Sequence, residues 1–340
     1  MKQKCLIIAE LSANHDGDIE IAKETIRAAK RAGADAIKIQ TYTSDTLTLD
    51  CKTDDFKVQG GTLWDGRYLH ELYKDASLPW EWHKELFDLA KKEGLICFST
   101  PFDNSAVDFL EELNCPIYKI ASFEIADIPL IEYVAKKQKP IIMSTGIANY
   151  DDIKLAVETC RKAGNNDITV LKCTSSYPAP INEANLKMMK RFSKDFGVKV
   201  GLSDHTIGNL LPILSIALGA TAIEKHFKLN DDVGGADAAF SVNEQDFKIL
   251  VDEIRLAELA MGEETYELTE KQISGKRYGR SLYISKDLKS GEILTKENIK
   301  SVRPGLSLHP KYYNEVLGRQ VIKDLNKGSR FSLKDLKQNN

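Results

Sequence analysis

Eight short apolar runs alternate with amphipathic segments over the first 260 residues, and this alternation constrains the fold more than any other feature of the chain. Each run has four to six residues rich in Ile, Val and Leu without strict polar alternation, which is typical of parallel strands covered on both faces. The runs are residues 6–11, 36–40, 96–99, 117–120, 141–144, 168–172, 198–203 and 222–226. Eight strands with eight intervening helices predict an α/β fold, a (β/α)8 TIM barrel of about 250 residues.

Glycines at positions 33, 94, 164 and 219 support this interpretation, because each stands where a helix would end before the next strand. A doubly wound open sheet is the alternative. No Gly-x-Gly-x-x-Gly follows the first run, which weakens a dinucleotide-binding interpretation.

Two parts of the chain depart from this alternation. Residues 41–79 form an unusually long connection that carries Trp64 and ends at Trp80 and Trp82, and such a loop predicts a packed lid. After Met261 the alternation stops, so we expect a barrel domain at 1–261, a polar linker at 262–276 and a small β-rich domain at 277–340.

Composition excludes several classes of protein. The 340 residues carry a net charge of −3, which argues against a general nucleic-acid binder. No apolar run approaches the 18 or so residues of a transmembrane helix, and the run before Glu10 is too short for the core of a signal peptide. The six cysteines are scattered singly, as expected for reduced thiols in a cytoplasmic protein.

Polar and ionisable residues collect at the C-terminal ends of the runs, where barrel enzymes carry their catalytic groups. The opposite ends are apolar, and this asymmetry predicts an enzyme. The polar ends include Glu10, Lys38, Gln40, Thr100, Lys119, Ser122, Glu124, Ser144, Ser175, Tyr177, Ser203, His205, Glu224 and His226.

His205 and His226 end adjacent predicted strands, about 4.8 Å apart, so both imidazoles can converge on one metal ion. In a closed barrel Glu10 falls beside His226, and two histidines with a carboxylate suit a divalent Lewis acid. The alternative is that both histidines are hydrogen-bonded rim residues. We interpret His15 as a residue that organises its loop.

Lys38 and Lys119, with the rim hydroxyls, suit an anionic substrate that carries a phosphate and a carboxylate. A buried lysine can instead form a Schiff base, and Lys172 on the sixth run is the rival candidate for that role.

The ordered motifs of the chain resemble those of the sialic acid synthase (NeuB-like) family. The resemblance covers nearly the whole chain and ends in a tail similar to the family's C-terminal antifreeze-like (SAF, β-clip) domain. The motifs are IAELSANHDG at 8–17, KIQ at 38–40, STPFD at 99–103, KIAS at 119–122, GLSDH at 201–205, EKH at 224–226, GRS at 279–281, VRPG at 302–305 and LGR at 317–319.

Within the family, residues 61–66 of the expected lid and residues 171–180 resemble the corresponding segments of the pseudaminic acid synthases. Sialic acid synthases commonly carry His at the position of Lys172. The segment 235–241 of this chain, around Asp237, also differs from the Asp-His pair that is usual in those enzymes.

The resemblance implies condensation of phosphoenolpyruvate with an open-chain acetamido sugar, here 2,4-diacetamido-2,4,6-trideoxy-altrose, to a nine-carbon 2-keto acid and phosphate. It implies a divalent metal on His205 and His226, with Mn²⁺ favoured over Mg²⁺ or Co²⁺, and catalytic carboxylates at Glu10 and Glu124. Phosphoenolpyruvate would be held by Lys38, Thr100, Lys119, Ser122, Ser144, Ser175 and Ser203. The sugar would be held by Gln40, Tyr177, Asp237 and Arg303.

The resemblance also implies a domain-swapped homodimer, in which Arg303 reaches the partner's barrel. An N-acetylneuraminate or legionaminate synthase is the alternative within the family. A metal-independent Schiff-base aldolase and a non-catalytic sugar-binding protein are more distant alternatives.

Overall fold

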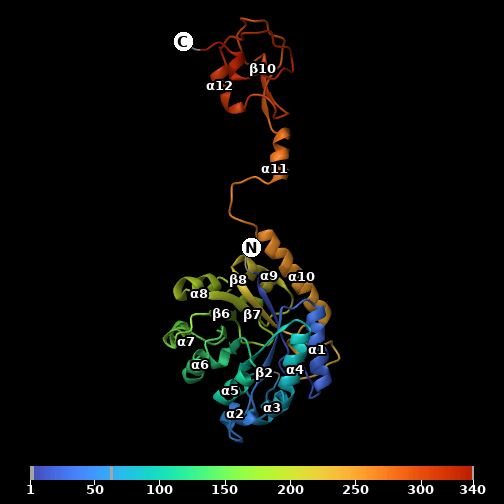
Figure 1. Cartoon of the computed structure of the whole chain (residues 1–340), viewed down its shortest axis with the longest axis vertical. Helices are drawn as coiled ribbons and strands as arrows, with labels where there is room; N and C mark the ends of the chain where they lie inside the picture. The colour runs from blue at the N-terminus through green and yellow to red at the C-terminus, as the bar shows by residue number, and fades with distance from the viewer. Residues whose placement is uncertain (1–3, 62–63, 339–340) are drawn as a thin grey trace. The chain divides into compact units, whose positions relative to one another are not determined.

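The chain divides into two compact units, Met1–Gly262 and Glu263–Asn340 (Figure 1). The structure is a computed structural model that describes residues 4–61 and 64–338. Thr62 and Leu63 of the expected lid lie outside the described residues. So do residues 1–3 of the expected barrel domain and residues 339–340 of the expected small domain.

Eight parallel strands close the first unit into a barrel in which each strand pairs with the next and β8 pairs with β1. The predicted (β/α)8 fold is therefore confirmed. The strands are β1 (Leu6–Glu10), β2 (Ala36–Thr41), β3 (Ile96–Pro101), β4 (Tyr118–Ile120), β5 (Ile141–Ser144), β6 (Ile168–Cys173), β7 (Lys199–Asp204) and β8 (Ala220–His226).

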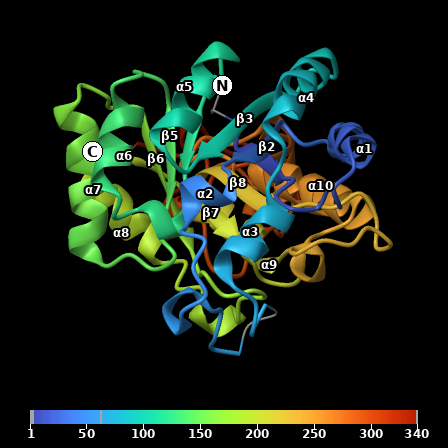
Figure 2. The same ribbon diagram turned by 90° about the horizontal axis from the view of Figure 1, so that it is seen from below.

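Most helices surround this barrel, whereas α2 (Ser44–Leu47) and α3 (Leu69–Ala76) lie over one end of it, as the view from below shows (Figure 2). The surrounding helices are α1 (Ile19–Arg31), α4 (Trp80–Lys92), α5 (Asn104–Glu112), α6 (Ile128–Ala135), α7 (Tyr150–Lys162), α8 (Met188–Phe196), α9 (Leu210–Ala217) and α10 (Glu244–Met261).

Helix α1 illustrates how the sequence specifies each unit of the barrel. The Asp18 side chain accepts a hydrogen bond from the Glu20 N–H and caps the first turn. Ala22 and Ile26 are fully buried on one face of the helix. Gly33 ends the segment with φ of +88°, a conformation that glycine adopts without a Cβ penalty.

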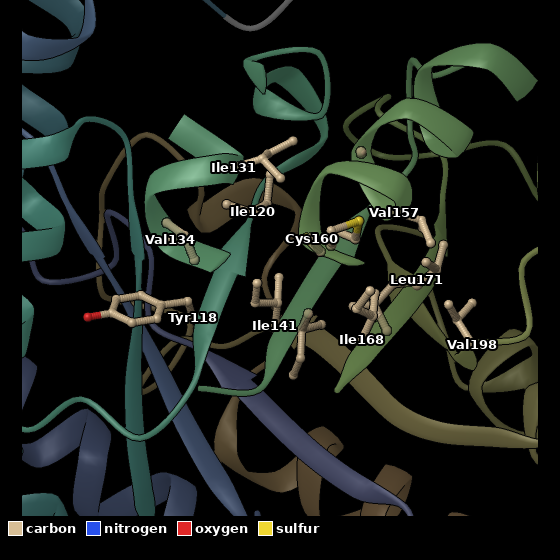
Figure 3. Close-up of a cluster of buried hydrophobic side chains, with 14 of the residues drawn as sticks. Tyr118, Ile120, Ile131, Val134, Ile141, Val157, Cys160, Ile168, Leu171 and Val198 are labelled. Carbon is tan, nitrogen blue, oxygen red and sulfur yellow. The ribbon is translucent and has the colours of Figure 1, made fainter. Parts of the chain in front are cut away.

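The interior between strands and helices is apolar. Figure 3 shows part of this core, in which Tyr118 and Ile141 on β4 and β5 lie with Ile131, Val134 and Val157 on α6 and α7. Burying each large aliphatic side chain contributes about 1.5–3 kcal/mol, so this layer fixes the strands that carry the polar rim.

The long connection 41–79 is structured over its described residues and contains α2 and α3. Trp80, at the start of α4, donates its indole N–H to the Tyr42 carbonyl oxygen at 3.2 Å and stacks on Phe109 at 4.8 Å. The connection is therefore anchored to the barrel at its C-terminal end.

The second unit has its own core around Leu282, Ile284, Leu294 and Val316. It contains the antiparallel strands β9 (Ser281–Ile284) and β10 (Ile299–Val302) and the helix α12 (Tyr313–Val316). At the start of this unit, the stretch expected to be a plain polar linker contains the short helix α11 (Glu270–Gly275). Thr269 and Gln272 form a capping box at its start, which explains why a polar segment is helical here.

No helix in the described part of the chain combines the length and the apolar character that crossing a membrane requires. All six cysteines are free thiols.

Candidate active site

A cavity of about 570 Å³ opens where the barrel strands end, and fourteen of the predicted site residues line it. Their individual roles remain predictions. They are Glu10, Lys38, Gln40, Thr100, Lys119, Ser122, Glu124, Ser144, Ser175, Tyr177, Ser203, His205, His226 and Asp237. Arg303 follows β10 in the second unit, where it is exposed.

Two lysines and two carboxylates form a buried cluster in this cavity. Lys38 Nζ lies 2.6 Å from Glu10 Oε2 and 4.0 Å from Glu224 Oε2. Lys119 Nζ lies 3.6 Å from Glu224 Oε1. With both carboxylates ionised, the two negative charges balance the two ammonium groups. The ammonium groups can therefore bind an anionic ligand only if a carboxylate takes up a proton or moves away.

Burial is the largest influence on the pKa values in this cluster. Burial raises the pKa of Glu10 to about 7, although the Lys38 ammonium opposes that rise. Burial would also raise the pKa of Glu224, but the nearby Lys119 and Lys38 outweigh it and lower that pKa. Burial lowers the pKa of Lys119. Glu10 is therefore the member of this cluster that exchanges a proton near neutral pH.

Hydroxyl groups complete the floor of the cavity. Lys38 Nζ donates to Thr100 Oγ1 at 3.1 Å, and Lys119 Nζ donates to Ser144 Oγ at 2.7 Å. The Ser203 hydroxyl donates to Glu224 Oε1 at 3.2 Å. These contacts direct both ammonium groups towards hydroxyls, an arrangement that suits the several oxygens of a phosphate.

Gly146, just after β5, lets the backbone approach two further hydroxyls. Its N–H donates to Ser122 Oγ at 3.0 Å. A Cβ at this position would lie 1.9 Å from Ser175 Oγ and 2.8 Å from Ser122 Oγ, so any side chain here would displace these two serines.

His205 and His226 lie side by side, with ring centroids 5.3 Å apart. His205 Nδ1 lies 3.0 Å from the Thr174 carbonyl oxygen, so Nδ1–H donates there. His226 Nδ1 is buried without a hydrogen-bond partner, 3.9 Å from Asp237 Oδ2. Burial and the neighbouring cations hold the pKa of His226 well below its usual range, so the ring is neutral at pH 7.

His226 suits a divalent ion, because its orphaned, neutral imidazole nitrogen is what a metal ligand requires. Burial would lower the pKa of His205, but contact with the Cys173 thiol outweighs burial and raises it, so His205 would have to lose its proton to join His226 at a metal. Glu10 pairs in register with His226 on β1 and β8, but its carboxylate contacts Lys38. Among the residues that the structure describes, no group of three His, Cys, Asp or Glu is gathered to hold a metal. The third protein ligand expected at Glu10 is therefore not in place.

Glu124 lies at a second position in the cavity, at the end of the helical turn Ser122–Glu124 that follows β4. Its Oε2 is buried and has no hydrogen-bond partner. Burial raises its pKa to about 7, which suits a group that gives and takes a proton.

The outer wall of the cavity is aromatic and includes the long connection. Tyr177 lies 4.5 Å from His205 and 4.8 Å from Phe240, centroid to centroid. Trp64 packs on Tyr177 at 6.1 Å and donates its indole N–H to the Ala236 carbonyl oxygen at 3.2 Å. The connection thus covers the cavity together with the loop after β8.

Hydrogen bonds join this outer loop to the first strand. Gln40 Nε2 donates to both Glu10 Oε1 and Ser12 Oγ at 3.1 Å. The Ser12 hydroxyl in turn donates to the Asp237 carboxylate.

Sequence reasoning did not assign a site role to Glu224 or Ser12, which both line the cavity. Alternation along β8 was a usable signal for Glu224, because residues two apart share a face and His226 was already a candidate. Lys172 does not line this cavity but a separate one of about 1040 Å³, and its Nζ donates to the Cys173 carbonyl oxygen. Lys172 is therefore not a Schiff-base candidate in the central cavity, whereas Lys119 lies within it.

His15, expected to organise its loop, accepts a hydrogen bond from the Gly17 N–H at Nδ1 at 3.1 Å.

A closed barrel whose strand ends carry a polar, ionisable cavity is the architecture of a TIM-barrel enzyme. The NeuB family model matches residues 25–266, and the SAF domain model matches residues 279–337. This chain belongs to the NeuB family and carries a C-terminal SAF domain.

Relatives agree over nearly the whole length. The chain is 50% identical to a pseudaminic acid synthase of Helicobacter pylori over 99% of both chains. It is 48% identical to a pseudaminic acid synthase of Campylobacter jejuni, over 98% of this chain and 97% of that protein. An N-acetylneuraminic acid synthetase of Leptospira borgpetersenii, solved with citrate, is 29% identical and superposes with a TM-score of 0.72, over 81% of this chain and 91% of that one.

Proposed function

We propose that this chain is a pseudaminic acid synthase, a phosphoenolpyruvate-dependent condensing transferase that acts on 2,4-diacetamido-2,4,6-trideoxy-altrose. The near end-to-end similarity to pseudaminic acid synthases supports the choice of sugar. The observation that carries the chemistry is the buried pair of lysines, each hydrogen-bonded to a hydroxyl, in the same cavity as the two histidines.

Phosphoenolpyruvate is assigned to the floor of the cavity. Lys38 and Lys119 neutralise its phosphate and carboxylate, and surrounding hydroxyls orient the phosphate oxygens. The hydroxyls are those of Thr100, Ser122, Ser144, Ser175 and Ser203. While Glu10 and Glu224 are ionised, they already balance the charges of Lys38 and Lys119, and a bound phosphate adds further negative charge. We therefore infer that Glu10 takes up a proton when phosphoenolpyruvate binds.

His205 and His226 would hold a divalent ion, with Mn²⁺ favoured over Mg²⁺ or Co²⁺. When bound, such an ion supplies Lewis-acid polarisation of the sugar aldehyde. Gln40, Tyr177 and Asp237 line the same side of the cavity and are assigned to the sugar.

The reaction joins carbon 3 of phosphoenolpyruvate to the aldehyde carbon, and the aldehyde oxygen becomes a hydroxyl. The positive charge left at carbon 2 is met by water, which loses a proton to a carboxylate. The tetrahedral intermediate then expels phosphate by cleavage of the C–O bond, the proton of its new hydroxyl passes to the departing phosphate, and a 2-keto acid remains. Glu10 and Glu124 serve as the proton carriers, because burial brings both pKa values to about 7.

Arg303 is assigned to the sugar from the partner chain of a domain-swapped homodimer. The second unit is small, and a module of this size gains stability by packing on another surface. The enzyme is further assigned to the cytoplasm, where free thiols persist.

A phosphate-release assay on a panel of acetamido sugars tests this function. We expect kcat/KM to be highest for the 2,4-diacetamido-2,4,6-trideoxy-altrose. A higher value for N-acetylmannosamine or for the legionaminic acid precursor would refute the sugar assignment and leave the reaction class. Trapping of pyruvate on Lys119 by borohydride, with activity retained in EDTA, would instead favour the Schiff-base aldolase.

A further inference from the structure

Two triplets end the neighbouring strands β7 and β8: Ser203-Asp204-His205 and Glu224-Lys225-His226. The outer members of each triplet line the cavity, and the middle members do not. Register pairs Ser203 with Glu224 and Asp204 with Lys225. Because side chains alternate along a strand, Asp204 and Lys225 face the opposite side of the barrel wall from the histidines.

The two middle residues form a buried ion pair. Lys225 Nζ lies 2.5 Å from Asp204 Oδ2, and both side chains are 1% exposed. The same ammonium group donates to the Thr206 carbonyl oxygen at 2.6 Å. Asp204 Oδ1 accepts the Thr206 N–H at 3.1 Å and the Thr206 hydroxyl at 2.8 Å.

The residues of this network are sequence neighbours of both histidines. Asp204 and Thr206 flank His205 on either side, and Lys225 immediately precedes His226. The Lys225 ammonium group, next to His226, therefore contacts both residues that flank His205. The two imidazoles, with ring centroids 5.3 Å apart, stand at the ends of the two strands that this network joins.

Stability alone is a weak reason for such a pair. Removing two charges from water is expensive, and replacing a buried ion pair by apolar residues is often neutral or stabilising. The contacts of this network are among Asp204, Lys225 and Thr206, so it acts on the two imidazoles through the backbone that carries them. Outer groups that hold metal ligands in place are known to tune metal affinity.

We propose that Asp204, Lys225 and Thr206 form a positioning network that sets the spacing of His205 and His226 and thereby the affinity for the divalent ion. The proposal rests on the metal site of the proposed function. If the network were only a staple between strands, its removal would change the stability of the fold and leave metal affinity unchanged.

The test is the double variant Asp204→Asn with Lys225→Met, which removes both charges and retains a side-chain oxygen for Thr206. The matched control is Asp167→Asn with Lys199→Met. That ion pair has a length of 2.8 Å, involves the first residue of β7, and has side chains about half exposed. The full-length proteins are compared by Mn²⁺ titration calorimetry without substrate, by the visible absorption of bound Co²⁺, and by thermal unfolding without metal.

We expect the double variant to bind Mn²⁺ about 10–100-fold more weakly, with an altered Co²⁺ spectrum, whereas the control variant binds as the parent does. Equal Mn²⁺ affinity and an unchanged Co²⁺ spectrum in the double variant would overturn the proposal, whatever happens to the unfolding temperature. A parent protein that binds no divalent ion would overturn both this inference and the proposed metal site.

If the double variant does not fold, Thr206→Val provides the test. It removes only the hydroxyl that donates to Asp204 Oδ1 and keeps the backbone contacts. A weaker Mn²⁺ affinity in the folded Thr206→Val protein supports the network, and an affinity equal to that of the parent refutes it.

Discussion

Binding of phosphoenolpyruvate should draw a proton onto Glu10, and the affinity should fall as the pH rises above 7. Glu10 lies 2.6 Å from Lys38, and its pKa is about 7 because burial opposes ionisation. An anion held by Lys38 comes within about 4 Å of this carboxylate. At an effective dielectric constant of about 20 that repulsion is about 4 kcal/mol, enough to keep Glu10 protonated at pH 8.

The pH dependence of phosphoenolpyruvate binding follows from this rise in the pKa of Glu10. The free carboxyl is about half protonated at pH 7 and about one-tenth protonated at pH 8. Uptake by Glu10 is therefore about half a proton at pH 7 and about 0.9 at pH 8, and the association constant falls by nearly tenfold for each further pH unit. Below pH 6 the carboxyl is already protonated, and its contribution to the pH dependence disappears.

Titration calorimetry in two buffers of different ionisation enthalpy measures this uptake directly. The phosphate of the ligand has its own proton equilibrium, so the informative quantity is the difference between the parent and Glu10→Gln. We expect the variant to lack the Glu10 uptake and to bind with little further weakening between pH 7 and pH 8. Identical proton uptake in both proteins would refute the assignment of Glu10 as the linked group.

Three further predictions follow from the site. His205→Ala and His226→Ala should each abolish turnover and Mn²⁺ binding in calorimetry with the circular dichroism spectrum unchanged, and full activity in metal-free protein would contradict this. Gly146→Ala should raise the KM for phosphoenolpyruvate at least tenfold, because the new Cβ would lie 1.9 Å from Ser175 Oγ, and an unchanged KM would show that the loop is not at the substrate. Mixing inactive His226→Ala and Arg303→Ala proteins under subunit exchange should restore roughly a quarter of the activity, since half the dimers are mixed and each has one intact site of two, whereas no recovery despite verified exchange would exclude the swapped dimer.

The barrel could be predicted because each local signal agrees with the global fold. The run 141–144, three apolar residues followed by a serine, predicts a strand, and β5 spans Ile141–Ser144. Helix ends at Gly33, Gly94 and Gly164 each have a positive φ. The position of the rim followed in turn, because parallel strands in a barrel all end at one face.

Three features of the structure were not predicted, each for a different reason. The polar segment after the barrel gave no apolar periodicity, so α11 was missed although its capping box was legible. Lys172 looked equivalent to Lys119, and only alternation along β6 directs it to a separate cavity. The pairing of Glu10 with Lys38 was also invisible, because it depends on the register between β1 and β2.

The measurement that tests the central claim most directly follows the bridging oxygen of phosphoenolpyruvate. The substrate is labelled with ¹⁸O between carbon 2 and phosphorus and incubated with the enzyme, Mn²⁺ and 2,4-diacetamido-2,4,6-trideoxy-altrose. We predict one phosphate released for each nine-carbon 2-keto acid formed, with the label in the phosphate, because the C–O bond breaks. Label retained in the keto acid, or no phosphate released with this sugar, would contradict the account.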